Sequence, residues 1–132
     1  MSATIPPEKT DLLATEKRAF AHLALVLKDG TPQVTPLWFE WDGECIIINT
    51  ARGRVKDNVL RRHPTVAIAI SDPQEPYRYI QIKGEVVSED EAGGRAMIDT
   101  LSQKYLGKPY GGYKGETRVT YRIKPVRFET NA

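Results

Sequence analysis

Two Asp-Gly pairs constrain the fold of this chain more than any other feature. Asp29-Gly30 and Asp42-Gly43 each separate two runs that are rich in apolar and β-branched residues. An Asp-Gly pair between such runs is a strong signal for a β-hairpin turn. Consecutive antiparallel strands are therefore expected at residues 22–28, 33–41 and 44–50.

Strand patterns recur later in the chain, and helical patterns separate them. Further strands are predicted at residues 65–71, 77–88 and 118–129, and helices at residues 8–15, 54–62 and 89–106. The last helix is expected in spite of Gly93 and Gly94. This order predicts a mainly β protein, whose six-stranded antiparallel sheet closes as a β-barrel because closure removes unpaired edges.

The length and net charge of the chain indicate how many domains it has and which partners it can bind. Its 132 residues predict a single domain, 1–132, in which residues 1–7 are a flexible lead-in. The net charge of +2, from 19 basic and 17 acidic residues, is too small to predict a nucleic-acid partner. We find no apolar run of membrane-span length and no signal-peptide pattern, so we expect a cytoplasmic protein that does not bind membranes.

The lone cysteine and the two histidines predict no metal site. Cys45 lies inside a strand pattern and is expected to be a small buried apolar residue. His22 and His63 are far apart and stand where surface or capping histidines are common. No Ser-His-Asp set or carboxylate pair stands out either, so an enzyme built from this chain would take its chemistry from a cofactor.

The turn between residues 48 and 58 is the most informative candidate site. A strand ends there, Gly53 makes the turn, and the next helix opens with Arg54 and Lys56. Helix N-termini normally collect acidic residues, because the helix dipole is positive at that end. A bound phosphate would resolve this conflict, since free N–H groups, the dipole and both cations would then face one anion. A solvated basic turn is the alternative.

Two more cations follow in the same predicted helix. Arg61 and Arg62 lie near its C-terminus, where cations are favourable without any ligand. We interpret them as mainly structural, although either could hold an anionic tail.

The 33–41 strand carries a proline in its middle. Pro36 cannot donate a ladder hydrogen bond, which places it at a sheet edge, at a bulge or beside a ligand. Trp38, Phe39 and Trp41 follow, and alternation puts at least one of them in the core. An aromatic residue here could also lie beside a flat cofactor ring.

Two further segments combine aromatic and basic residues. Tyr77, Arg78 and Tyr79 open the 77–88 strand, where they either pack as ordinary strand residues or close a groove. The 104–110 segment is interpreted as a solvent-facing loop with Tyr105 packed inward, although functional loops have a similar composition.

These segments, in this order, resemble the pyridoxamine 5′-phosphate oxidase-like split β-barrel superfamily. Within it the chain is most similar to the small, probable F420-dependent (flavin or deazaflavin) oxidoreductases. The resemblance runs from about Leu12 onward, and the matching stretches are PQVTPLWFEWDGE, NTARGRVKDNVLRRHPTVAI, DPQEPYRYIQIKGEV and LSQKYLGKPY.

The resemblance implies a six-stranded split barrel that forms a homodimer with two cofactor sites at the interface. It also implies a role for individual residues of the matching stretches. The phosphate would lie against Thr50, Arg54, the Val55 backbone and Lys56. Asn49 and Arg61 are also expected to bind the cofactor. The flavin-like ring would lie along Thr35, Pro36, Leu37 and Trp38, with Arg78 and Tyr79 as contacts from strand 77–88 or from the partner subunit.

The implied activity is hydride transfer between coenzyme F420 and an unidentified small conjugated organic substrate. Flavin mononucleotide (FMN) is the alternative cofactor, and a non-catalytic flavin or haem carrier is a third possibility. Val55 stands where FMN-dependent oxidases of the superfamily tend to carry a cation, and Arg54 adds one a residue earlier. The C-terminal substrate segment of the pyridoxine oxidases is also missing, so oxidation of pyridoxamine phosphate is not expected.

Overall fold

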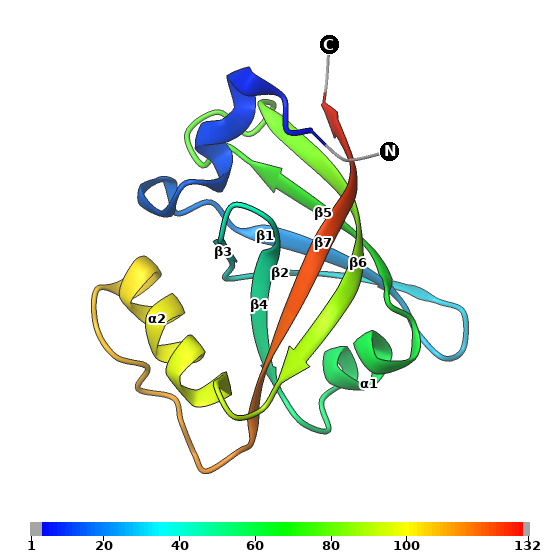
Figure 1. The fold of residues 1–132 in the computed structure, drawn as a ribbon, viewed down its shortest axis with the longest axis vertical. Coiled ribbons are helices and arrows are strands. Elements are labelled where there is room, and N and C mark those ends of the chain that lie inside the picture. Colours follow the sequence, from blue (N-terminus) through cyan, green and yellow to red (C-terminus); the bar gives the residue numbers. More distant parts are fainter. Residues whose placement is uncertain (1–3, 131–132) are drawn as a thin grey trace.

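The computed structural model describes residues 4–130, and antiparallel strands dominate it (Figure 1). Two 3-10 helices, η1 and η2, precede the first strand, and two α-helices interrupt the strand order. In chain order the elements are η1 (Pro7–Leu13), η2 (Thr15–Lys17), β1 (Ala21–Val26), β2 (Pro32–Leu37), β3 (Glu40–Trp41), β4 (Ile46–Ala51), α1 (Val55–Arg62), β5 (Thr65–Ser71), β6 (Tyr79–Asp90), α2 (Gly94–Leu106) and β7 (Arg118–Thr130).

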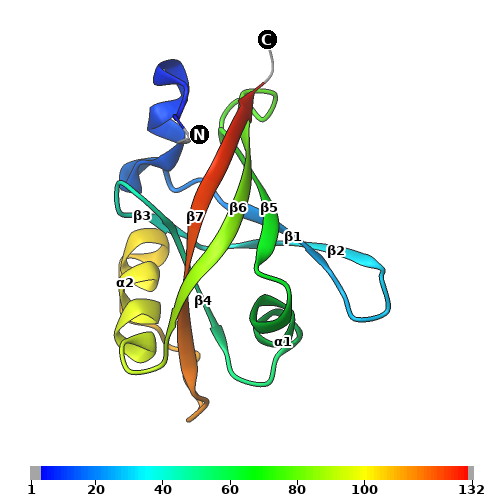
Figure 2. The same cartoon turned by 45° about the vertical axis from the view of Figure 1, so that its right-hand side comes forward.

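The strands form one curled sheet in the order β2-β1-β5-β6-β7-β4-β3, with every neighbouring pair antiparallel. β2 and β3 lie at opposite edges of this sheet, yet only Trp38 and Phe39 separate them in the chain. The two edges must therefore come close together in space, which curls the sheet into a split β-barrel (Figure 2). We call residues 38 and 39 the crossover.

The barrel interior is filled by alternating strand residues. Leu23, Ile68 and Ile82 face one another on β1, β5 and β6, as the strand register requires, and all are at most 2% exposed. Phe39 of the crossover is fully buried in the same cluster. Val59 and Leu60 of α1 also belong to this cluster, so α1 packs against the barrel interior.

α2 packs on a different surface. It contacts β4 and β7, and Figures 1 and 2 show α1 and α2 on either side of the β4 end. Ile98 and Leu101 of α2 are buried but lie outside the main core cluster. The helix begins very close to β7, because a Cβ on Gly94 would collide with the backbone of Arg118 and Val119.

The predicted fold class is confirmed, with differences in detail. The expected 33–41 strand is divided into β2 and β3, because the crossover must carry the chain from one sheet edge to the other. The expected 8–15 helix is the 3-10 helix η1, and α2 starts at Gly94 rather than at residue 89 because β6 continues to Asp90. Cys45 is buried, as expected.

Candidate functional site

A cavity of about 520 Å³ lies between α2, β4 and the end of β2. Four predicted cofactor residues line it, and five residues that were not predicted complete it. The lining residues are Phe20, Pro36, Leu37, Trp38, Asn49, Ile98, Leu101, Tyr110 and Arg118. This volume is within the usual range of small-molecule sites. We call it the α2 cavity.

Asn49 and Arg118 provide the polar side chains of the α2 cavity. Arg118 Nε donates to Asn49 Oδ1 at 2.8 Å, and Arg118 Nη1 donates to Glu116 Oε2 at 3.2 Å. Asn49 Nδ2 donates in turn to Gly94 O at 2.9 Å and to Thr120 Oγ1 at 3.2 Å. The guanidinium is thus held in place by its neighbours, with a side chain only 4% exposed.

Aromatic rings form the wall of the cavity at the crossover. The Trp38 ring stacks on Tyr105 at a centroid distance of 5.4 Å and an interplanar angle of 7°. Tyr105 stacks on Phe20 at 5.2 Å, and Tyr110 meets Trp38 edge-on at 6.5 Å. Such arrangements stabilise ring pairs beyond the area they bury, so the orientation of Trp38 is fixed by packing.

Two α2 side chains hold the crossover backbone. Lys104 Nζ donates to Phe39 O at 2.6 Å, and its side chain is 1% exposed. Burial lowers the pKa of Lys104, and nearby Glu40 opposes that shift. The Tyr105 hydroxyl donates to Ala19 O at 2.6 Å and accepts from Phe39 N at 3.2 Å. Burial raises the pKa of Tyr105, so this hydroxyl keeps its proton at neutral pH.

The turn after β4 leads into the start of α1, where a phosphate was expected. Gly53 has a φ angle of 87°, a left-handed backbone that glycine adopts easily. α1 begins at Val55, and no side chain caps its N-terminus. Arg54 and Lys56 form no ion pair with another residue of the 4–130 range. Burial and then the Arg54 charge lower the pKa of Lys56, so a nearby anion would stabilise its charged form.

Asp57 fixes this turn from the protein interior. Its carboxylate is 1% exposed and accepts hydrogen bonds from Gly53 N at 3.0 Å, Arg52 Nη1 at 2.9 Å and the Tyr121 hydroxyl at 2.5 Å. Burial opposes ionisation, but these donors together lower the pKa of Asp57. The acidic residue of the first helical turn is therefore engaged inside the protein.

The other predicted residues occupy several places. Thr50 is buried at the end of β4, on the interior side by alternation, and Thr35 lies on β2 opposite Leu23. Arg61 is exposed, with Nε 3.9 Å from Glu89.

Arg78 and Tyr79 lie apart from both the α2 cavity and the α1 turn. Arg78 donates to Asp11, Asp72 and the Glu8 carbonyl, and so ties η1 to the segment before β6. Tyr79 lines a smaller cavity of about 190 Å³ with His22 and Val34.

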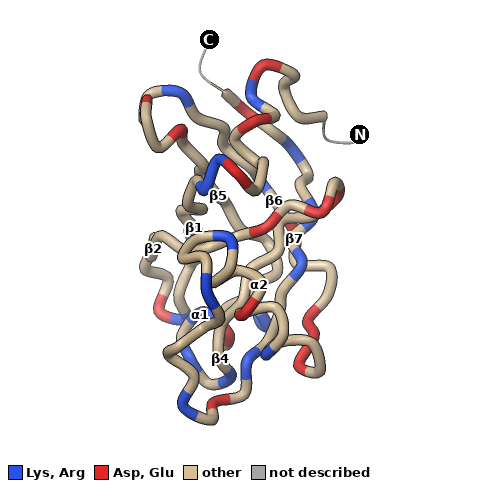
Figure 3. The backbone as a smooth tube through the Cα atoms, turned by 90° about the vertical axis from the view of Figure 1, so that its left-hand side faces the viewer, with Lys and Arg blue, Asp and Glu red and all other residues tan. Residues whose placement is uncertain are grey.

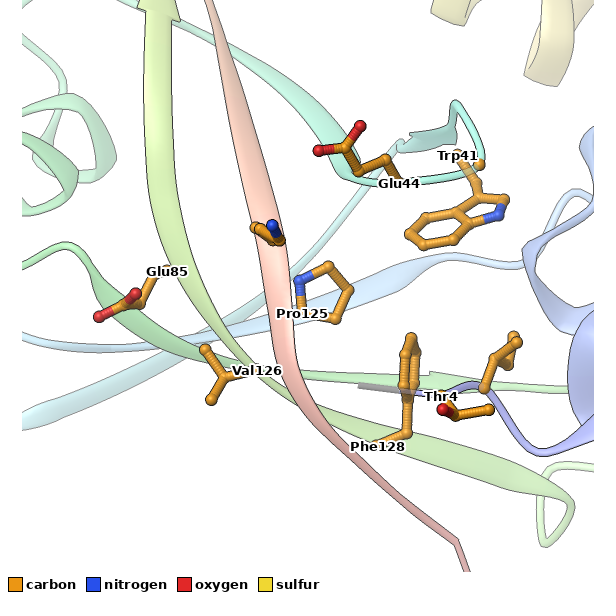
Figure 4. Close-up of a pocket in the computed structure, with 10 residues that line it drawn as sticks. Thr4, Trp41, Glu44, Glu85, Pro125, Val126 and Phe128 are labelled. Atoms are coloured by element: carbon orange, nitrogen blue, oxygen red, sulfur yellow. The ribbon is translucent and has the colours of Figure 1, made fainter. Parts of the chain in front are cut away.

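A second large cavity contains none of the predicted residues. It has a volume of about 600 Å³, and Figure 4 shows Trp41, Pro125 and Phe128 around it. Glu44 and Glu85 also line it, but no described hydrogen bond or ion pair connects them across the space.

Five residues of the α2 cavity were missed by sequence reasoning: Phe20, Ile98, Leu101, Tyr110 and Arg118. The 104–110 segment was correctly expected to pack Tyr105 inward, but its interpretation as a solvent-facing loop was wrong for Lys104, which is buried. Tyr110 lines the cavity. Arg118 opens the last strand and carries no local signal, because only the sheet register brings it beside Asn49.

Charge and composition give no second type of site. Figure 3 shows acidic and basic segments interspersed along the backbone. Within residues 4–130 no group of three or more His, Cys, Asp or Glu side chains is placed to hold a metal ion. No helix in that range is both long and apolar enough to cross a membrane.

Comparisons with known proteins agree with this architecture. A family model described as pyridoxamine 5′-phosphate oxidase matches residues 6–132. A solved F420 reductase is 32% identical, with a TM-score of 0.84, over 95% of this chain and 98% of that protein. A putative pyridoxamine 5′-phosphate oxidase from Listeria innocua shares the fold at 20% identity, with a TM-score of 0.71, over 93% and 94% of the two chains.

A conserved hypothetical protein from Mycobacterium tuberculosis also shares the fold. It is 21% identical, with a TM-score of 0.72, over 98% of this chain and 86% of that one. No curated protein matches the chain at a significant level.

Proposed function

Because the chain belongs to the pyridoxamine 5′-phosphate oxidase family, we propose that it is an F420-dependent oxidoreductase acting on a small conjugated organic substrate. The family and the similar F420 reductase support an oxidoreductase of this fold with a flavin-type cofactor. The choice of F420 rests on that relative together with the charge pattern at the start of α1.

The single observation that carries the proposal is the uncapped start of α1. The first N–H groups of an α-helix have no partner within the helix. At Val55 and Lys56 these groups lie beside two cations that no described carboxylate neutralises. A phosphate would accept from the N–H groups and neutralise Arg54 and Lys56 at once. The residues present therefore fit the phosphate end of a deazaflavin or flavin.

The α2 cavity supports the placement of a flat ring. Pro36 and Trp38 give it a rigid apolar surface at the sheet edge, and Asn49 adds one amide. A deazaflavin bound between this surface and α1 would supply a hydride to a conjugated acceptor. The chain's own part would be to orient both partners and to keep water away from them. Thr35 would support the strand from its interior side, and Leu37, at the end of the strand, also lines the cavity.

Homodimer formation and cytoplasmic location remain parts of the proposal. In the dimer, Arg78 and Tyr79 of the partner subunit would be candidate contacts to the cofactor. Within one subunit Arg78 already anchors η1, so its contribution to a ligand would come through the backbone of the segment that it holds.

Parallel titrations of the purified protein with F420 and with FMN test this function. We expect Lys56→Ala to weaken F420 binding about 10- to 150-fold, because a charge-assisted hydrogen bond contributes about 1.5–3 kcal/mol. Lys124→Ala is the matched control, since Lys124 is an exposed lysine on β7 beside the other large cavity. Equal affinities for the two variants would refute the phosphate placement, and tighter binding of FMN would reassign the cofactor.

A further inference from the structure

Arg118 is the only charged side chain among the described residues that line the α2 cavity. Its side chain is 4% exposed, and the remaining lining is aromatic or aliphatic apart from Asn49. A buried charge in such surroundings is stabilised only when its hydrogen bonds are satisfied. The hydrogen-bond partners of each Arg118 nitrogen therefore determine whether the residue can bind a ligand.

The hydrogen-bond donors of Arg118 are only partly used. Nε donates to Asn49 and Nη1 donates to Glu116, whereas Nη2 donates to no residue in the 4–130 range. A guanidinium carries five N–H donors in one plane, and that geometry matches a planar oxygen acceptor. The unused edge is therefore available to an acceptor from outside the chain.

The rings around Arg118 determine the shape of that acceptor. Tyr110 lies with its ring centroid 5.5 Å from Arg118 Cζ, and Trp38 meets Tyr110 edge-on. Both rings, with Phe20, present flat apolar surfaces to the cavity. A flat conjugated ligand would stack on them while its oxygen reaches the guanidinium.

We propose that the α2 cavity binds a planar aromatic carboxylate or conjugated carbonyl compound, and that Arg118 holds its oxygen. Calling this ligand the hydride acceptor rests on the proposed function, but the binding itself does not. Asn49 sets the plane of the guanidinium, because it accepts from Nε and is itself anchored to Gly94 and Thr120.

Glu116 would compete with this ligand for Arg118. Its contact with Arg118 is a single Nη1–Oε2 approach of 3.2 Å, and the Glu116 side chain is 20% exposed. Removing the charge of Glu116 leaves Arg118 with more positive potential for a ligand oxygen. The proposal thus predicts opposite effects for substitutions at the two ends of one ion pair.

The test is a binding titration of the cofactor-free protein, read by tryptophan fluorescence. The chain has two tryptophans, so a Trp41→Phe background leaves Trp38 of the α2 cavity as the reporter. The probes are 1-naphthoate, its carbonyl analogue 1-naphthaldehyde, and 1-naphthylmethylammonium as a cation of similar shape. Circular dichroism and thermal melting check that each variant is folded.

We expect 1-naphthoate and 1-naphthaldehyde to quench Trp38 at lower concentrations than the ammonium probe. Arg118→Met should weaken naphthoate binding about tenfold or more, and Glu116→Gln should strengthen it severalfold. If Arg118→Met does not fold, Arg118→Lys keeps the charge and loses the planar fork, and it should weaken binding by a smaller factor.

Three results would overturn the proposal. They are equal affinities for the anionic and cationic probes, unchanged naphthoate affinity in folded Arg118 variants, and weaker naphthoate binding by Glu116→Gln. Competition between naphthoate and F420 or FMN is expected, because the proposed cofactor ring borders the same cavity. A fourth result would also overturn the proposal: if Arg118→Met lowers the affinity for F420 or FMN as much as the affinity for naphthoate, Arg118 belongs to the cofactor site. If neither cofactor binds but naphthoate binding depends on Arg118, the proposed function fails and this site stands.

Discussion

Replacing Asp57 tests whether the turn before α1 is held from inside the protein. Asp57→Ala removes the acceptor used by Gly53 N, Arg52 and the Tyr121 hydroxyl. Breaking a buried, hydrogen-bonded charge pair from one side typically costs about 3–5 kcal/mol. Because domains of this kind are stable by about 5–15 kcal/mol, the variant should fold but unfold at much lower denaturant. Urea titration followed by circular dichroism measures the difference.

Asp57→Asn is the matched control, and it adds a pH test. Asparagine keeps an oxygen acceptor and loses the charge, so we expect a smaller loss of stability than with alanine. The pKa of Asp57 is lowered in the folded protein, so its carboxylate stabilises the fold above the unfolded pKa of about 4. That contribution is lost as the pH falls through the folded pKa. The wild type should therefore lose more stability between pH 5 and pH 2 than Asp57→Asn does.

Two results would refute this reasoning. One is an Asp57→Ala variant whose unfolding free energy is within about 0.5 kcal/mol of the wild type, which is the range of ordinary surface substitutions. The other is an acid-stability curve of Asp57→Asn that runs parallel to that of the wild type.

Two further predictions concern the edges of the fold. Gly94→Ala should destabilise the protein by about 1–3 kcal/mol in urea titrations, because its Cβ would meet the β7 backbone, whereas Gly93→Ala should be milder because its Cβ meets only the movable Asp90 carboxylate. Similar losses for the two variants would refute the tight α2–β7 packing. Arg78→Ala should make η1 more sensitive to proteolysis without changing the digestion of α2, because Arg78 ties η1 to Asp72. Unchanged cleavage of η1 would contradict that role.

Local signals explain which parts of the fold could be predicted. Both Asp-Gly turns lie between paired strands, and β5 has the predicted limits, because turn chemistry and alternation act over a few neighbouring residues. Pro36 was expected at an edge, a bulge or a ligand-facing surface. It lies on the edge strand β2 and lines the α2 cavity.

Tertiary closure explains what could not be predicted. The division of the 33–41 strand into β2 and β3 depends on the two sheet edges coming together. The nine residues of that segment do not by themselves indicate this closure. The burial of Lys104 likewise depends on the carbonyl of Phe39, 65 residues earlier in the chain. A glycine is unfavourable in a helix by propensity. The presence of Gly94 in α2 is explained only by the close approach of β7, which leaves no room for a Cβ.

The candidate site divides in the same way. Pro36, Leu37, Trp38 and Asn49 were found through the resemblance of contiguous stretches, and the fold brings them to one cavity. Phe20 and Arg118 come from the two ends of the chain. These two residues reach the cavity only because of the order in which the strands pair, and local sequence patterns do not predict that order.

The two-residue crossover also has a consequence for how this protein could diversify. The same two residues that connect the opposite edges of the sheet include Trp38, whose indole lines the α2 cavity. A substitution at Trp38 that reshapes the cavity therefore also perturbs the crossover, which holds the two edges of the sheet together. Substitutions on the opposite wall, at Ile98 of α2 or at Tyr110 in the loop after it, would reshape the cavity without changing the crossover residues.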